Sequence, residues 1–87
     1  MTEQPAPSVG RIVIYRAKTR GYPLPAIVTA TRDTLDPIGL ERGDVPPLDA
    51  YTTVHLHVMT PGAQGSYTEH AIPQGDGPGT WSWPERV

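Results

Sequence analysis

The 87-residue sequence contains no cysteine and no phenylalanine, so its aromatic residues are two tryptophans and four tyrosines. The missing cysteines exclude disulfides, thiolate metal sites and thiol nucleophiles. A net charge of −2 and a pI near 5.8 provide no basic footprint for duplex nucleic acid or an anionic membrane. No apolar run reaches membrane-spanning length, and residues 1–7 lack the features of a signal peptide. We therefore expect a soluble, unexported chain with one small domain.

Eleven prolines and nine glycines divide the chain into short segments that are rich in Val, Ile, Thr and Tyr. No window between them has convincing helical periodicity, so we predict an all-β fold. The expected architecture is a five-stranded, partly open SH3-like barrel formed by residues 9–87. Residues 1–8 are expected to form an extended N-terminal arm that orders only against a partner.

The five expected strands lie near residues 9–15, 25–31, 52–59 and 66–72 and at the tryptophan pair. Between the second and third strands, residues 32–50 form one long acidic loop, which is unusual in a compact domain and is either functional or mobile. Within this loop, the apolar segment 38–40 is expected either to fold back onto the barrel or to form a single helical turn.

Three histidines raise the question of a metal site, because His55 and His57 share a face of one strand and His70 lies on the next. Carboxylates gather in the long loop, but they lack the spacing of an EF-hand. No nucleophile elbow, phosphate loop or dinucleotide motif is present. We therefore expect no enzyme, no cofactor and no metal site, and solvent-facing roles for the histidines and for the acidic side chains, which are Asp33, Asp36, Glu41, Asp44 and Asp49.

The hairpin register decides whether the histidines meet. If Met59 pairs with Ser66, then His70 lies opposite His55 and the imidazoles cluster. A shift by one residue separates them and seats Ile72 beside a core valine. The second register is favoured here because it buries the isoleucine.

Both tryptophans lie in the segment Thr80–Pro84, two residues apart, so they point to the same face of a short strand. In a chain without phenylalanine, we expect this strand to close the core, with Trp81 the more deeply buried. Aromatic and basic side chains near the first turn could instead line a groove that binds a partner. The expected partner-binding residues are Trp83, Tyr22, Arg20, Pro5 and Pro7.

Four segments together resemble a family of small proteins encoded by tailed bacteriophages and prophages. Its members open with a motif like V-G-R-I-V-H-Y, continue with A-A-I-V or P-A-I-V, and end with G-T-W-H-W-P-E. In this chain Ile14 and Ser82 stand where the family usually has histidine, so no role of those histidines carries over. The matching segments are Val9–Val13, Pro25–Thr29, Val54–Val58 and Gly79–Glu85.

The resemblance implies a non-enzymatic phage accessory protein and supplies no activity. We expect it to dock on the virion, as a capsid decoration or a head- or tail-associated protein, and to be repeated in many copies. It would then be found in the virion and, before assembly, in the cytoplasm of the infected bacterium. The alternative is a phage-encoded binding module that regulates a host or phage protein or a nucleic acid. The acidic pI disfavours nucleic acid.

Overall fold

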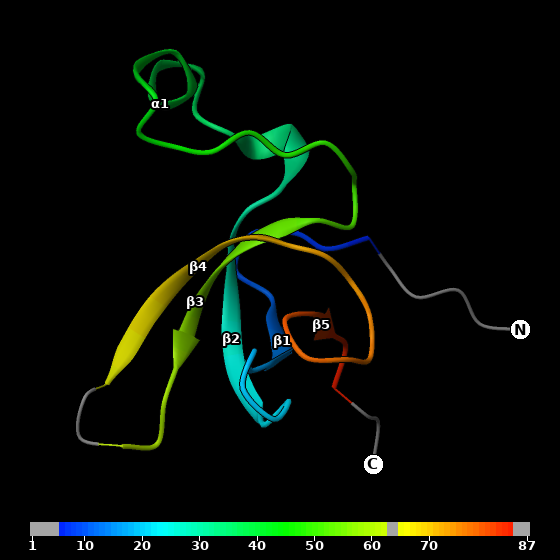
Figure 1. Ribbon diagram of the computed structural model, residues 1–87. Coiled ribbons are helices and arrows are strands. Elements are labelled where there is room, and N and C mark those ends of the chain that lie inside the picture. Colours follow the sequence, from blue (N-terminus) through cyan, green and yellow to red (C-terminus); the bar gives the residue numbers. More distant parts are fainter. Residues whose placement is uncertain (1–5, 63–64, 85–87) are drawn as a thin grey trace, which may run out of the picture.

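The computed structural model describes residues 6–62 and 65–84. Its central feature is one antiparallel sheet with the strand order β4-β3-β2-β1-β5, shown in Figure 1. The predicted all-β sheet with five short strands is confirmed. The strands are β1 (Ile12–Arg16), β2 (Pro23–Ala30), β3 (Val54–Met59), β4 (Ser66–Ile72) and β5 (Trp81–Ser82).

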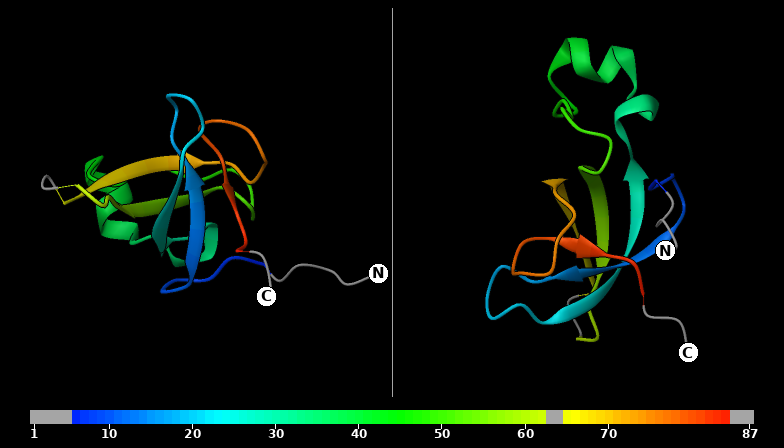
Figure 2. Two further views of the ribbon diagram at one scale, coloured as in Figure 1. Left: turned by 90° about the horizontal axis from the view of Figure 1, so that it is seen from below. Right: turned by 90° about the vertical axis from the view of Figure 1, so that its right-hand side faces the viewer.

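The sheet curls on itself, but it is not closed by strand pairing between β4 and β5 in the described parts of the chain. Side-chain contacts link β4 to β1 and to the turn after β1 instead. The Tyr15 hydroxyl of β1 donates to Glu69 Oε2 of β4 at 2.5 Å. Lys18 Nζ, in the turn after β1, lies 3.7 Å from the same oxygen. Figure 2 shows the resulting curl, with β4 and β1 on opposite sides of the core.

The core lies on the concave side of this curl, which we call the inner face. It is built from alternate residues of the strands, as expected for a sheet with one buried side. Trp81 of β5 is fully buried, and its ring meets that of Trp83 edge to face at 5.4 Å. The prediction that Trp81 belongs to the core is confirmed. The core residues are Val13, Tyr15, Ala26, Val28, Val54, Leu56, Val58, Ile72 and Trp81.

Residues 31–53 connect β2 to β3 and project from the sheet; we call them the excursion (Figures 1 and 2). They contain a 3₁₀ turn, Arg32–Thr34, and a short helix, α1 (Pro37–Arg42). The helical alternative for segment 38–40 is therefore correct, although the sequence shows no helical periodicity there. Its end signals explain the helix: Asp36 caps the first turn, Pro37 starts it and Gly43 ends it with a φ of 77°.

The β3–β4 pairing combines both of the registers considered above. From Met59–Ser66 to Leu56–Glu69 the strands follow the first register, so the favoured one is wrong over this stretch. The register then shifts by one residue, and Val54 pairs with Ile72 as the second register requires. A bulge near Ala71, whose φ is 54°, makes this possible. It buries Ile72 without giving up the hairpin pairing.

Candidate docking surface

The sheet also carries apolar side chains on its convex side. Ile12 of β1 lies opposite Ile27 of β2, and Ile14 lies opposite Pro25. Each alternates with a core residue, so each points away from the core. Ile12 is 56% exposed and Pro25 is exposed, whereas Ile14 and Ile27 are half-buried. Together with the half-buried Met59 of β3, these residues form what we call the outer face: Ile12, Ile14, Pro25, Ile27 and Met59.

An antiparallel sheet with one side in water normally alternates apolar and polar residues, whereas continuous apolar strands are typical of sheets covered on both sides. The β1 sequence Ile-Val-Ile-Tyr and the β2 sequence Leu-Pro-Ala-Ile-Val do not alternate. This unbroken apolar run is the signal in the sequence for a second apolar face, and the predictions above did not draw on it.

The outer face contains no acidic or basic residue. Its cross-strand neighbours are not Asp, Glu, Lys or Arg: His57 lies opposite Ile27, Thr68 opposite His57, and Ser82 opposite Ile14. Along β1, Arg16 lies two residues beyond Ile14 on the same side of the sheet, so one basic side chain borders the outer face. Binding to a phosphate backbone or an anionic membrane draws on several Lys and Arg side chains. The outer face is therefore more complementary to an apolar surface than to a phosphate backbone or an anionic membrane.

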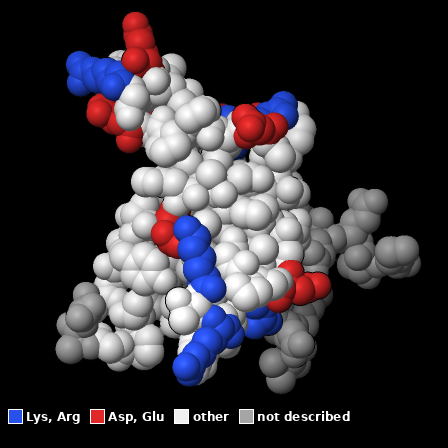
Figure 3. Space-filling model, viewed as in Figure 1, with Lys and Arg blue, Asp and Glu red and all other residues white. Residues whose placement is uncertain are grey.

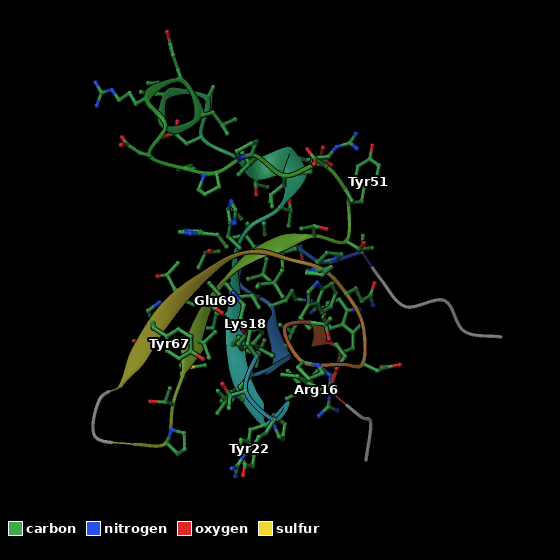
Figure 4. All side chains as sticks on the ribbon, in the orientation of Figure 1. Arg16, Lys18, Tyr22, Tyr51, Tyr67 and Glu69 are labelled. Atoms are coloured by element: carbon green, nitrogen blue, oxygen red, sulfur yellow. The ribbon has the colours of Figure 1, made fainter. Side chains whose placement is uncertain are left out.

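The predicted partner-binding residues do not form one site. Arg20 and Tyr22 are both exposed and lie in the turn after β1, and Figure 4 shows Tyr22 at the lower end of the molecule. Trp83 lies beyond the opposite end of the β1–β5 pairing, since Ser82 already pairs with Ile14. Its ring is partly buried, and the Arg11 guanidinium carbon lies 5.6 Å from the ring centroid.

The arm residues differ from the expectation where they are described. Pro7 is buried, and the Ser8 carbonyl accepts a hydrogen bond from the Arg11 amide at 3.2 Å. This part of residues 1–8 is therefore held against the domain rather than extended away from it. Pro5 lies outside the described residues, so the proposed ordering of the arm on a partner stays a prediction for that part.

Charged side chains gather at the two ends of the view in Figure 3, with most of the surface between them uncharged. The excursion carries acidic residues at one end, together with Arg32 and Arg42. Arg16 ends β1, and Lys18 and Arg20 follow in the β1–β2 turn, where the Lys18 side chain reaches Glu69 (Figure 4). The basic turn is a second exposed feature with the character of a binding surface.

Two tyrosines flank Glu69 at the open side of the sheet, as Figure 4 shows for Tyr67. Burial, then the hydrogen bond and charge of Glu69, raise the pKa of Tyr15 far above its usual value. Burial and the same charge raise the pKa of Tyr67. Both phenols are therefore protonated at neutral pH, and Tyr15 acts as a hydrogen-bond donor that links β1 to β4.

The histidines come closer together than we expected, because the first register holds beside the hairpin loop. The rings of His55 and His70 meet edge to face at 4.8 Å. Both ring nitrogens of His55 nevertheless bond backbone groups, so this side chain cannot ligate a metal without breaking them. In the parts of the chain that the structure describes, no group of three or more His, Cys, Asp or Glu residues is placed to hold a metal ion.

Comparison with known proteins gives no match: no family model, no curated protein and no solved structure is similar to the chain. Within residues 6–62 and 65–84, no helix is long and apolar enough to cross a membrane. The functional argument therefore rests on the geometry of the surface and on the motifs in the sequence.

Proposed function

We propose that the protein is a non-enzymatic docking protein whose outer face binds an apolar surface of a larger protein assembly. The observation that carries the proposal is the two-sided apolar character of β1 and β2. Val13 and Ala26 lie opposite each other and fill the core. The neighbouring cross-strand pair, Ile12 and Ile27, faces outward. A contiguous exposed apolar surface in a small domain marks an interaction site.

We propose a bacteriophage virion as the assembly, with the protein attached to the head shell or the tail. The motifs that resemble the phage family support this choice, because they contain three of the five outer-face residues. Ile12 belongs to the opening motif, and Pro25 and Ile27 belong to the motif Pro-Ala-Ile-Val. Ile14 stands where the family usually has histidine, and Met59 lies outside the matching segments. A flat apolar patch that many copies use at once fits a decoration or accessory role, since avidity compensates for a small contact area.

The finer fold that we propose is an SH3-like, partly open barrel. The strand order, with β5 returning to pair with β1, supports it. So does the contact across the open side, where Tyr15 reaches Glu69. In such a barrel the inner positions fill the core and the outer positions of the strands remain available to a partner.

A second candidate function is regulation of a host or phage protein or of a nucleic acid through the β1–β2 turn. The exposed Tyr22, beside Arg20 and Lys18, favours it, because stacking and positive charge are the means by which proteins hold acidic ligands. The turn is small and the chain as a whole is acidic, so this function ranks below docking through the outer face.

Quantitative mass spectrometry of virions purified from the phage or prophage that encodes the chain tests the proposal. We expect the protein to remain with the particles through density-gradient purification, in a fixed ratio to the major capsid or a tail protein. A protein found only in the infected-cell lysate, and absent from intact particles, would contradict the virion role and favour the regulatory one.

A further inference from the structure

His55 joins two parts of the molecule that are distant in the sequence. It lies in β3 and is only 3% exposed. Its Nε2 atom lies 2.8 Å from the carbonyl oxygen of Pro46 in the excursion. Its Nδ1 atom accepts a hydrogen bond from the amide of Ala71, in the β4 bulge, at 3.0 Å. The ring therefore bridges the excursion and the end of β4.

These two bonds define the state of the ring. A carbonyl oxygen only accepts and an amide N–H only donates, so Nε2 must carry a proton and Nδ1 must be bare. Only the neutral ring with its proton on Nε2 satisfies both partners of His55. A second proton on Nδ1 would face the amide N–H of Ala71, and that hydrogen bond would be lost. The bond to Pro46 could persist.

Burial and the neighbouring His70 ring oppose a positive charge on His55, and only the Pro46 carbonyl favours one. From β4, the His70 ring lies edge to face against it, and a charge on His70 repels one on His55. From the excursion, the contact is the uncharged carbonyl of Pro46, and the nearest acidic residues along the chain, Asp44 and Asp49, are exposed. From β2, Ala30 pairs opposite. No carboxylate bonded to the ring offsets the cost of charging it.

The backbone of the bulge is strained. Ala71 has a φ of 54°, a conformation that residues with a Cβ adopt only at a steric cost. Its amide bond to His55 helps to hold it there. Once that bond is lost, the backbone can relax toward an ordinary conformation.

We propose that His55 is a pH-dependent clasp, closed when the ring is neutral and opened by protonation, which breaks the bond to the Ala71 amide and frees the β4 bulge while the bond to Pro46 stays in place. The device is independent of the docking role of the outer face. It would hold the β4 bulge less firmly in mildly acidic surroundings than at neutral pH.

The direction of the pH effect follows from burial. Burial lowers the pKa of His55, charge on His70 lowers it further, and the hydrogen bond to Pro46 works against both. The folded chain thus binds fewer protons here than the unfolded chain, whose histidines titrate at about 6.5. The contribution of the clasp is complete above that pH and is lost as the pH falls below it toward the lowered value.

Two-bond ¹H–¹⁵N spectra of the histidine rings in the intact protein test the closed state directly. At pH 7.5 we expect His55 to be the neutral tautomer with its proton on Nε2, and to titrate below the free value of about 6.5. A proton on Nδ1 at neutral pH, or titration above the free value, would overturn the proposal. This experiment needs no variant, so it does not depend on whether a substituted chain folds.

Amide exchange between pH 7.5 and 5.0 tests the opening. After correction for the intrinsic rate, exchange at Ala71 should rise by about tenfold for each unit by which the pKa of His55 is lowered. In His55→Gln, whose side chain can donate and accept but cannot titrate, this rise should disappear. His57→Gln removes a histidine from the same strand and should leave it in place. An unchanged rise in His55→Gln would refute the clasp.

Discussion

Both faces of the β1–β2 pair carry large apolar side chains, with Arg16 at one border of the outer face, but the two faces have opposite surroundings in the fold. Val13 is fully buried by its own chain, whereas its neighbour Ile12 is 56% exposed. A pair of strands with isoleucine and valine on both sides has two apolar faces. An 87-residue chain with one curled sheet cannot cover both of them. This difference indicates that the inner face determines stability, and it supports the proposal that the outer face binds an external partner.

The largest effect is expected at Trp81, whose ring fills the inner face and whose Nε1 donates to the Thr52 carbonyl at 2.7 Å. Trp81→Ala should lower the free energy of unfolding by about 3–5 kcal/mol, a large share of the stability of a small domain. Trp83→Ala should cost less, because Trp83 is only partly buried. Thermal and urea melts measure the free energy of unfolding of both variants. Equal losses would show that the two tryptophan rings contribute equally to the stability of the fold.

A matched pair of substitutions separates the faces. Val13→Thr places a hydroxyl in the core without a partner and should cost about 1–3 kcal/mol. Ile12→Thr keeps the β-branched shape on the outer face and should change stability by less than about 0.5 kcal/mol. Urea melts decide between these expectations. A comparable loss in both variants would mean that the outer face is already packed in the isolated protein.

Removing the Tyr15 hydroxyl, at the polar edge of the inner face, should have an intermediate effect on the free energy of unfolding. Tyr15→Phe keeps the buried ring and removes the hydroxyl that donates to Glu69. A hydrogen bond to a charged group is worth about 1.5–3 kcal/mol, and the Lys18 ion pair compensates for part of this. We expect a loss of about 1 kcal/mol. If the melting curve were unchanged, the side-chain link across the open side of the sheet would contribute nothing to the fold.

The smallest expected effect is a gain in stability, at a residue that belongs to neither the inner nor the outer face. Ala71→Gly should stabilise the protein by up to about 1 kcal/mol, because glycine adopts the φ of 54° without a steric cost. The amide that bonds His55 is retained. As a control, Ala50→Gly changes an exposed loop residue with no positive φ and should not stabilise. Destabilisation by Ala71→Gly would show that the bulge conformation is not strained.

Much of the sheet could be predicted from the sequence, because alternating strands and turn residues depend on local chemistry. The strand Val54–Met59 and the buried Trp81 are examples. Helix α1 was predicted only as one of two alternatives for segment 38–40, since six residues are too few for periodicity and the helix depends on its caps. The β3–β4 bulge was also missed, because burial of Ile72 and the hairpin pairing each favoured a different register, and only the folded chain satisfies both.

The candidate site was predicted less well than the fold. Aromatic and basic residues were considered as the lining of one groove, but Tyr22 lies in the turn after β1, whereas Trp83 follows Ser82 in the direction of the start of β1. A single sequence does not tell which of two apolar faces is filled by its own chain. That depends on the direction in which the sheet curls and on where Trp81 packs, which are properties of the whole fold.

The most direct test of the docking role is incorporation of the double variant Ile12→Thr/Ile27→Thr into virions. Its melting temperature should stay close to that of the wild type, since both residues lie on the outer face. Its copy number per purified particle should fall by about tenfold or more, as expected for a loss of at least 1.4 kcal/mol of binding free energy. The control Arg20→Ser/Tyr22→Ser, at the basic turn, should be incorporated normally. Normal incorporation of the isoleucine variant, with loss in the turn variant, would contradict the account.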